Sequence, residues 1–525
     1  MACGEFLQEF ETSDTRILNR LREIYGDDEP ILESRRMVFL RALEGFATHY
    51  GQEREVIISR APGRINLLGN HIDHRGGFVN YIAINRDMLM VASPRQDDTV
   101  EMRNSNTDRF PPRNFTIGAL LPSEKRGDWL SYIDSVDLPH GDWANYVQAA
   151  VLHLQDRFSD RTLKGMDLSV TGDVPIAAGL SSSSTLVVTA LQAAMQFNNL
   201  SLPYDQIAEF CGDAEWYAGT RGGAGDHAAM LYAKRQAVLP LRFFPLETGE
   251  APLPEGYRVV ACNSFVEHAP PGIFNERIAT YEIGFLLIKN RYPDHASRLD
   301  RLRDLSADNL GISLAEIYSM LKSLPERMTR TEILSALPGQ RDRLETLFSP
   351  HTEPGDGYRV RQVMLFGLAE CARGALCRRL LESGDIDGFG ELKYCSHNGD
   401  RQFTFSDGER HLVDNRISDS DIDQLVADLE SGVPERVAAA QVHLQTGGYD
   451  CSCEELDLLV DLASTVQGVV GAGLAGGGLG GCVLVIVKES AVDQLIDKLE
   501  SEFYKPRNLT NGTLVCASVA GSGIF

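Results

Sequence analysis

The chain has 525 residues, of which 43% are hydrophobic and 24% charged, a composition typical of a globular protein with two or three domains. Its formal net charge of −24 disfavours nucleic acid and anionic membranes as partners, because both attract clustered lysine and arginine. A small-molecule substrate fits this charge better. The ten cysteines include no metal-type Cys-x-x-Cys pair. Several lie inside apolar runs, where a free cysteine behaves as a small hydrophobic residue, and this favours a reducing compartment. Because no segment reaches about 18 apolar residues and the N-terminus lacks a signal-peptide pattern, we expect a cytosolic protein.

The N-terminal half predicts helices followed by a mixed α and β domain. Residues 1–50 show helical periodicity with a break at residues 27–30, which indicates a helical extension and lead-in. A first domain is then expected over residues 51–237. It contains helical patterns at residues 142–158 and 183–198, and short β-type runs at residues 56–59, 78–84, 88–92 and 166–170.

The C-terminal half predicts a second mixed domain at residues 238–525. Long helical patterns separate predicted strands at residues 257–262, 482–487 and 513–518. Polar stretches near residues 295–350 and 402–447 keep helical periodicity in parts, so we interpret them as insertions rather than linkers.

The most informative motif covers residues 174–185, where a glycine and four consecutive serines lead directly into a helical pattern. Glycine lets backbone N–H groups approach an anion, the hydroxyls add donors, and the positive end of the helix favours a polyphosphate. A helix cap without a ligand is the alternative, but it needs only one or two serines. The motif is neither a Walker loop nor a dinucleotide turn. We predict an ATP-phosphate cradle made of Gly179, Leu180, Ser181, Ser182 and Ser183.

Two further segments of small residues flank this cradle, at residues 60–79 and 468–487. With the three motifs in this order, the chain resembles the GHMP small-molecule kinases and, within them, the galactokinase branch. Further matches extend the resemblance over most of the chain, at residues 143–147, 389–392, 396–397 and 451–457. The resemblance implies an α+β fold of two domains, a ribosomal-protein-S5-like N-terminal domain and a ferredoxin-like C-terminal domain, with the active site in the cleft between them.

The resemblance also implies an enzyme that transfers the γ-phosphoryl group of MgATP to the anomeric hydroxyl of a galacto-configured sugar. Asp226 matches the carboxylate next to the attacking hydroxyl, and Arg64 matches its cationic partner. Glu215 and Ser183 match the ligands of Mg²⁺, a metal that takes few protein ligands. Without the resemblance, Asp226 would be interpreted as a helix N-cap and Arg64 as a solvated turn residue.

The family's sugar-binding positions correspond to Asn70, His71, Asp73 and Phe274. Alternating donors and acceptors suit a polyol, because an unsatisfied buried polar group costs about 1–3 kcal/mol. A metal site made of His71, Asp73 and His74 is a competing interpretation, although no further ligands cluster nearby in the sequence. Galactokinases carry glutamate where Asn70 stands and tyrosine where Phe274 stands.

The neutral amide of Asn70, together with His74 and Arg75, would favour an acidic sugar, and the segment is also similar to the galacturonokinase branch. A C6-carboxylated sugar therefore competes with galactose, and an aldopentose such as arabinose is a weaker candidate.

Two departures lie in the other motifs. Ser184 stands where alanine is usual, which should leave the helix start intact, and Gly473 stands where arginine is common, which predicts looser packing around the cleft. A non-catalytic galactose sensor is the alternative from another functional class. Such a protein should lack a catalytic or cradle residue, whereas all of these residues are present, namely Arg64, Ser183, Glu215 and Asp226.

Overall fold

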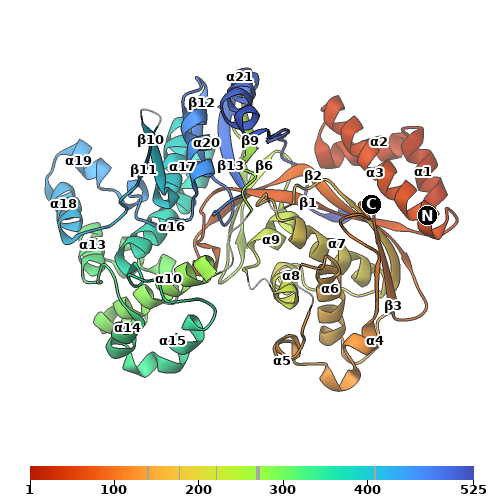
Figure 1. Cartoon of the computed structure of the whole chain (residues 1–525), viewed down its shortest axis with the longest axis horizontal. Helices are drawn as coiled ribbons and strands as arrows, with labels where there is room; N and C mark the ends of the chain where they lie inside the picture. Colours follow the sequence, from red (N-terminus) through yellow and green to blue (C-terminus); the bar gives the residue numbers. More distant parts are fainter. Residues whose placement is uncertain (139–140, 177, 220–221, 268–271, 407–408) are drawn as a thin grey trace. The chain divides into compact units, whose positions relative to one another are not determined.

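The computed structural model describes residues 1–138, 141–176, 178–219, 222–267, 272–406 and 409–525 (Figure 1). The chain divides into two compact units. The first consists of Met1–Ile65, Tyr81–Leu239 and Ala517–Phe525, and the second of Asn66–Asn80 and Pro240–Cys516. The predicted domain limits, at residues 51–237 and 238–525, do not separate out two short segments: Asn66–Asn80 groups with the second unit, and Ala517–Phe525 groups with the first. These limits remain a prediction about domains.

Three helices occupy the predicted helical stretch at the N-terminus. They are α1 (Cys3–Glu11), α2 (Thr15–Tyr25) and α3 (Glu29–Tyr50). Asp28 begins α3 by accepting a hydrogen bond from the backbone N–H of Ile31, a typical N-cap contact. The rings of Phe10, Phe39 and Phe525 lie with centroids 4.9–5.5 Å apart, so these helices share a core with the last residue of the chain.

A twisted sheet forms the centre of the first unit, with the strand order β15-β1-β2-β5-β3-β4. The strands are β1 (Ile57–Leu68), β2 (Val79–Pro94), β3 (Thr99–Asn104), β4 (Arg113–Thr116), β5 (Met166–Gly172) and β15 (Gly523–Ile524). Strand β6 (Ala237–Arg242) also pairs with β2, and it pairs in turn with β7 (Glu247–Thr248) and β8 (Ala251–Pro252).

Strand β2 corrects the sequence-based prediction, which placed separate strands at residues 78–84 and 88–92. The polar residues between these runs do not end the strand, because Asp87 is buried among partners. Its carboxylate lies 2.8 Å from Arg60 Nε and 3.5 Å from Arg35 Nη1, and it accepts a 2.7 Å hydrogen bond from the Tyr25 hydroxyl. A strand can therefore run through a buried charged residue when that residue is paired and hydrogen-bonded.

Helices cover the sheet of the first unit, and two of them match the patterns at residues 142–158 and 183–198. The helices are α4 (Ile117–Leu120), α5 (Trp129–Asp134), α6 (Ala144–Arg157), α7 (Ser182–Phe197), α8 (Ile207–Glu215) and α9 (Gly225–Tyr232). Buried apolar residues of α6, α7 and α8 form one continuous core with β3 and β5. The helix that follows the phosphate motif is therefore anchored along its length.

His153 on α6 is a largely buried histidine, with its ring centroid 4.5 Å from that of Trp129 and 4.0 Å from that of Phe210. Burial lowers its pKa from 6.5 to about 3. The unfolded chain takes up a proton below about pH 6.5, whereas the folded protein does so only near pH 3, so stability is lost as pH falls through that window.

We therefore expect His153→Phe to reduce the loss of stability in acid. Between pH 7.5 and 5, the free energy of unfolding should fall by about 2 kcal/mol more in the native protein than in this variant. Urea titrations at both pH values measure the difference. His49→Phe, at an exposed position on α3, is the control and should behave like the native protein. Equal losses in the native protein and His153→Phe would contradict the assignment.

The second unit contains a four-stranded antiparallel sheet with the order β12-β13-β9-β14. Its strands are β9 (Tyr257–Asn263), β12 (Val469–Leu474), β13 (Cys482–Lys488) and β14 (Thr513–Cys516). Numbered along the chain, the spatial order is second, third, first, fourth, which is the predicted ferredoxin-like arrangement. Apolar residues of α20 (Glu454–Ser464) and α21 (Val492–Leu499) form a common core with this sheet.

Long helices make up the rest of the second unit, namely α10 (Gly272–Arg291), α16 (Val360–Ser383) and α17 (Ile386–Asp400). Small elements lie in the two stretches interpreted as insertions (Figure 1). The first stretch holds α11 (Pro293–Ala296), α12 (Ala307–Leu310), α13 (Leu314–Lys322), α14 (Arg330–Ala336) and α15 (Arg341–Phe348), and the second holds β10 (Phe403–Ser406), β11 (Glu409–Leu412), α18 (Asp419–Glu430) and α19 (Pro434–Ala439). Residues of both share a buried core with α10 and α16. Within the described residues, no helix has both the length and the hydropathy needed to span a membrane.

Candidate active site

The predicted phosphate cradle forms the connection between β5 and α7. Ser181 immediately precedes α7 and has a φ of 59°, a left-handed conformation that non-glycine residues rarely adopt, and Gly179 has a φ of 74°. The first N–H groups of α7 have no carbonyl one turn before them, so they can donate to an anion. Leu180 contributes its backbone only, because its side chain is buried in the core.

Arg64 connects this turn to Asp226. The Arg64 Nε donates to Asp226 Oδ1 at 2.7 Å, and Nη2 donates to Oδ2 at 2.5 Å. The third nitrogen of the guanidinium, Nη1, donates to the carbonyl of Gly179 at 2.6 Å. Ser181 Oγ also donates to Asp226 Oδ2. Asp226 lies in the first turn of α9, while Ala224 occupies the N-cap position, so the carboxylate of Asp226 does not cap the helix.

The pKa of Asp226 lies below its ordinary value of 3.8. Burial raises this pKa, but the charge of Arg64 and the hydrogen bonds from Arg64 and Ser181 outweigh that effect. The Asp226 side chain is 30% exposed, whereas that of Arg64 is 8% exposed. At neutral pH the arrangement holds an ionised carboxylate in a fixed orientation and within reach of a ligand. Such a group can accept a hydrogen bond or a proton from a hydroxyl.

Glu215 ends α8 and is 6% exposed. Ser184 Oγ donates to Glu215 Oε2 at 3.0 Å, and His227 Nε2 lies 3.1 Å from the same oxygen. The serine hydroxyl that donates to this carboxylate is therefore that of Ser184, whereas Ser183 is the predicted metal ligand. Consecutive residues of a helix point about 100° apart, so Ser183 and Ser184 point in different directions, and Ser183 lines a cavity beside α7. In the sequence, Ser184 stood out only because galactokinases usually have alanine at that position, and nothing there indicated its contact with Glu215.

Carboxylate and hydroxyl oxygens at this position are suited to Mg²⁺, which prefers hard oxygen ligands and keeps most of its shell for phosphate and water. Among the described residues there is no group of three or more His, Cys, Asp or Glu side chains that could hold a metal. The competing interpretation of His71, Asp73 and His74 as a metal site therefore has no support from the described part of the chain.

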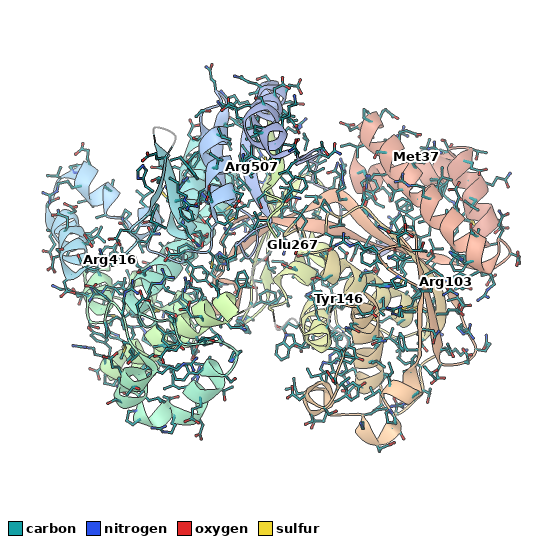
Figure 2. The ribbon with its side chains drawn as sticks, viewed as in Figure 1. Met37, Arg103, Tyr146, Glu267, Arg416 and Arg507 are labelled. Carbon is teal, nitrogen blue, oxygen red and sulfur yellow. The ribbon has the colours of Figure 1, made fainter. Side chains whose placement is uncertain are left out.

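A cavity of about 620 Å³ lies beside the start of α7, within the size range of small-molecule pockets. Ser182 and Ser183 form one part of its wall, and Tyr146 of α6, labelled in Figure 2, forms another. Aromatic, apolar and basic side chains line the rest, including Trp143, Phe110, Leu186, Arg109 and Arg113. The cavity can hold a flat aromatic ring while a phosphate chain extends to the serines.

In the second unit, the side chain of Asn70 is buried and bonded within the protein. Its amide nitrogen donates to the carbonyl of Leu474 at 3.3 Å, and its oxygen accepts from Asn66 Nδ2 at 3.1 Å. The backbone N–H of Asn70 donates to Glu370 Oε1 at 2.8 Å. Both polar groups of this predicted sugar ligand therefore have protein partners.

The cationic groups that suggested an acidic sugar also have partners. Arg75 Nη1 donates to Glu282 Oε2 at 2.7 Å, and His74 Nδ1 lies 3.0 Å from Asp73 Oδ1. Burial, together with the charge of Arg75, lowers the pKa of His74 below 6.5, so its ring is mostly neutral at pH 7. Burial raises the pKa of Asp73, but the contact with His74 outweighs it and the pKa falls below 3.8.

Phe274, the predicted sugar neighbour on α10, packs over the third glycine-rich segment. Its ring carbons lie 3.0 Å from the position that a Cβ would take at Gly477. A Cβ at Gly473 would lie 2.9 Å from His397 Cβ and 3.2 Å from Lys393 Cε, so this glycine is closely surrounded. Residues of α17 therefore leave no gap at Gly473 itself, and the looser packing around the cleft stays a prediction.

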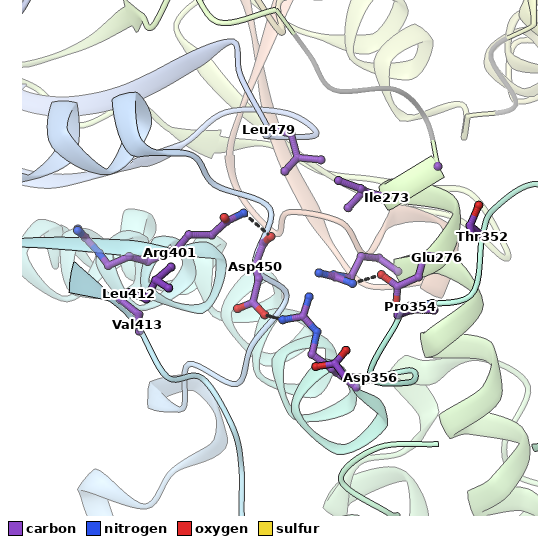
Figure 3. Close-up of a pocket in the computed structure, with 14 residues that line it drawn as sticks. Ile273, Glu276, Thr352, Pro354, Asp356, Arg401, Leu412, Val413, Asp450 and Leu479 are labelled. Carbon is purple, nitrogen blue, oxygen red and sulfur yellow. Dashed lines mark hydrogen bonds and ion pairs between the residues drawn. The ribbon is translucent and has the colours of Figure 1, made fainter. Parts of the chain in front are cut away.

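A second cavity, of about 630 Å³, lies in the second unit (Figure 3). Its charged lining consists of three arginines and three carboxylates, namely Arg277, Arg359, Arg401, Glu276, Asp356 and Asp450. Arg277 pairs with Glu276 and Arg359 pairs with Asp450 inside it. Because these pairs neutralise each other, the cavity is less suited to a polyphosphate than the one beside α7.

Known proteins resemble the chain over nearly its whole length. Three family descriptions match in order, the galactokinase galactose-binding signature at residues 44–94, the N-terminal domain of GHMP kinases at residues 145–234 and their C-terminal domain at residues 425–505. Galactokinase of Dictyostelium discoideum is 26% identical over 519 residues, which covers 96% of this chain and 95% of that protein. Galactokinase of Bos taurus is 26% identical over 467 residues, which covers 88% of this chain and 92% of that protein.

A solved structure confirms the predicted fold. The crystal structure of Lactococcus lactis galactokinase complexed with galactose matches with a TM-score of 0.66 and 21% identity. The match covers 91% of this chain and 98% of that one. The two-domain α+β architecture that the family resemblance implies is therefore present.

Proposed function

We propose that the chain is a GHMP kinase and, within that family, a galactokinase, which transfers the γ-phosphoryl group of MgATP to the anomeric hydroxyl of galactose. One observation carries this proposal: an ionised carboxylate, Asp226, is held by Arg64 and Ser181 at the turn that would bind the phosphates. The galactose-binding signature at residues 44–94 and the galactokinase relatives support the choice of substrate.

Asp226 is the proposed catalytic carboxylate. It accepts the proton of the attacking hydroxyl, or stabilises that hydroxyl while the proton leaves late in the reaction. Arg64 keeps Asp226 ionised and offsets negative charge near the transferred group. The hydrogen bond that Arg64 donates to the carbonyl of Gly179 links the catalytic pair to the phosphate turn. Catalysis would then consist mainly of positioning and charge neutralisation.

ATP is proposed to bind with its base in the cavity beside α7 and its phosphates on the Gly179–Ser183 turn. Glu215 and Ser183 would hold Mg²⁺, which supplies positive charge to the phosphate oxygens when bound. Ser184 and His227 both lie against Glu215 and keep its carboxylate in place. A buried carboxylate with fixed neighbours can bind metal without first being reordered.

The sugar is proposed to contact His71, Asp73 and Phe274, with Asn70 shaping the segment. Galactose is favoured over a uronate because the Arg75 guanidinium is already paired with Glu282 and His74 is mostly neutral at pH 7. A galacturonokinase or an arabinokinase is the alternative enzyme. A non-catalytic sensor is disfavoured because the Arg64–Asp226 pair is intact.

A panel of sugars tests this function. With MgATP, we expect ADP release to show the highest kcat/KM for galactose, with galacturonate at least about tenfold lower, since a binding site for a neutral polyol leaves a carboxylate without a cationic partner. Glucose serves as the epimer control. A preference for galacturonate or arabinose would replace the proposed substrate, and sugar binding without ADP release would identify a sensor.

The proposed location is the cytosol, supported by the absence of disulfides among the ten cysteines, all of which lie in the described residues. The net charge of −24 supports small molecules, rather than nucleic acid or anionic membranes, as partners.

A further inference from the structure

A buried carboxylate, Asp400, lies against the sugar motif of the second unit. It is the last residue of α17, and its side chain is 0% exposed. Asp400 Oδ1 accepts a long hydrogen bond, 3.3 Å, from the backbone N–H of Cys451. Asp400 Oδ2 lies 3.3 Å from His71 Nε2. Among the described residues, neither of these two facing atoms has a hydrogen-bond partner, so each is the nearest available partner of the other.

This carboxylate needs a donor, because an unpaired charge in the protein interior is strongly disfavoured. Lys393 is a buried cation whose pKa burial lowers overall, although the charge of Asp400 raises it. Its ammonium group donates to the carbonyl of Leu474 at 2.8 Å and not to Asp400. His397 lies against a different carboxylate, Asp457, at 3.2 Å. His71 is therefore the side chain placed to donate to Asp400 Oδ2.

The ring of His71 is held in other ways as well. It stacks on Tyr449 with a centroid distance of 4.4 Å and an interplanar angle of 23°. The backbone of His71 has a φ of 62°, in the left-handed region that favours glycine. A non-glycine residue keeps such a conformation only where its surroundings hold it, and this occurs often at ligand sites. Stacking defines the plane of the ring, and Asp400 defines its rotation within that plane.

We propose that Asp400 is a positioning residue for sugar recognition: it holds His71 with the proton on Nε2 and leaves Nδ1 to accept a hydrogen bond from a sugar hydroxyl. A neutral imidazole has one donor and one acceptor, so fixing the donor also fixes the acceptor. The inference rests on the proposed galactokinase function for the identity of the ligand, but the state of His71 does not depend on it.

The first measurement is the tautomer of His71 in the protein without ligands. In ¹⁵N-histidine-labelled protein, the His71 signals, assigned by their loss in His71→Gln, should show a protonated Nε2 and an unprotonated Nδ1. In Asp400→Leu the two nitrogens should shift toward a mixture of tautomers. An Nδ1-protonated ring in the native protein, or unchanged signals in Asp400→Leu, would overturn the proposal whatever the substrate is.

The second measurement separates sugar binding from turnover. Asp400→Leu should raise both the KM for galactose and its Kd in calorimetry without ATP by at least about tenfold, the scale of a lost hydrogen bond to a buried partner. The kcat and the KM for ATP should stay within about threefold. Asp400→Asn keeps the shape and an acceptor oxygen, so it should recover most of the affinity.

Asp457 offers a matched control, because it is a second buried carboxylate of the same unit facing a buried histidine. Asp457→Leu should lower the melting temperature without a change in the KM for galactose. Equal effects of Asp457→Leu and Asp400→Leu on this KM would show a general loss of packing and overturn the role of Asp400. If no sugar binds at all, the proposed function fails, while the tautomer measurement still decides whether Asp400 controls His71.

Discussion

Asp226→Asn is expected to lower kcat by at least about a hundredfold, the scale of lost general-base or electrostatic assistance. The amide keeps the size of the side chain but carries no charge, so it can neither take the hydroxyl proton nor balance Arg64. The pKa of Asp226 is already below 3.8, so the native carboxylate is ionised throughout the neutral range. Initial-rate measurements at saturating galactose and MgATP test this expectation.

Asp167→Asn is the matched control for this variant. Asp167 on β5 is also buried in the first unit and pairs with Arg54 at 2.8 Å and with Arg95 at 2.7 Å. Its substitution should lower the melting temperature but leave kcat within about twofold, because a general loss of stability leaves the folded fraction active at low temperature. The assignment of Asp226 fails if a folded Asp226→Asn protein keeps nearly native turnover.

Glu215→Gln is expected to raise the Mg²⁺ concentration for half-maximal activity by at least about tenfold, as losses around metal ligands usually do. The Kd for galactose, measured without nucleotide, should stay nearly unchanged, because the carboxylate would contact metal and not sugar. Activity across a Mg²⁺ titration and calorimetry with galactose give the two readouts. A loss confined to galactose affinity would contradict the metal role.

Substitutions of Ser183 and Ser184 test which of these adjacent hydroxyls binds the metal. Ser183→Ala should raise the Mg²⁺ requirement directly if Ser183 is the hydroxyl ligand. Ser184→Ala removes the hydrogen bond to Glu215 and should lower the free energy of unfolding by about 1–3 kcal/mol, the cost of leaving a buried acceptor with one donor fewer. If only Ser184→Ala changes the Mg²⁺ dependence, Ser184 replaces Ser183 as the proposed ligand.

The sequence alone determined the features that depend on neighbouring residues. Glycine, serine and helical periodicity at residues 174–198 defined a phosphate turn that leads into a helix, and α7 begins at Ser182. Alternating and helical patterns also predicted β9, β13 and β14 within a few residues, because side-chain spacing reflects local backbone geometry. The resemblance of three motifs added the order of the domains and the pairing of Arg64 with Asp226.

Only the tertiary structure decided which side chains meet across long stretches of chain. Ser184 donates to Glu215, Lys393 closes the space at Gly473, and Asp400 lies beside His71, more than three hundred residues earlier. Buried polar residues must find partners, but their sequence spacing does not say which partners, because packing of whole helices and sheets brings them together. For the same reason, a pattern that detects a motif does not show which of its atoms are already bonded within the protein.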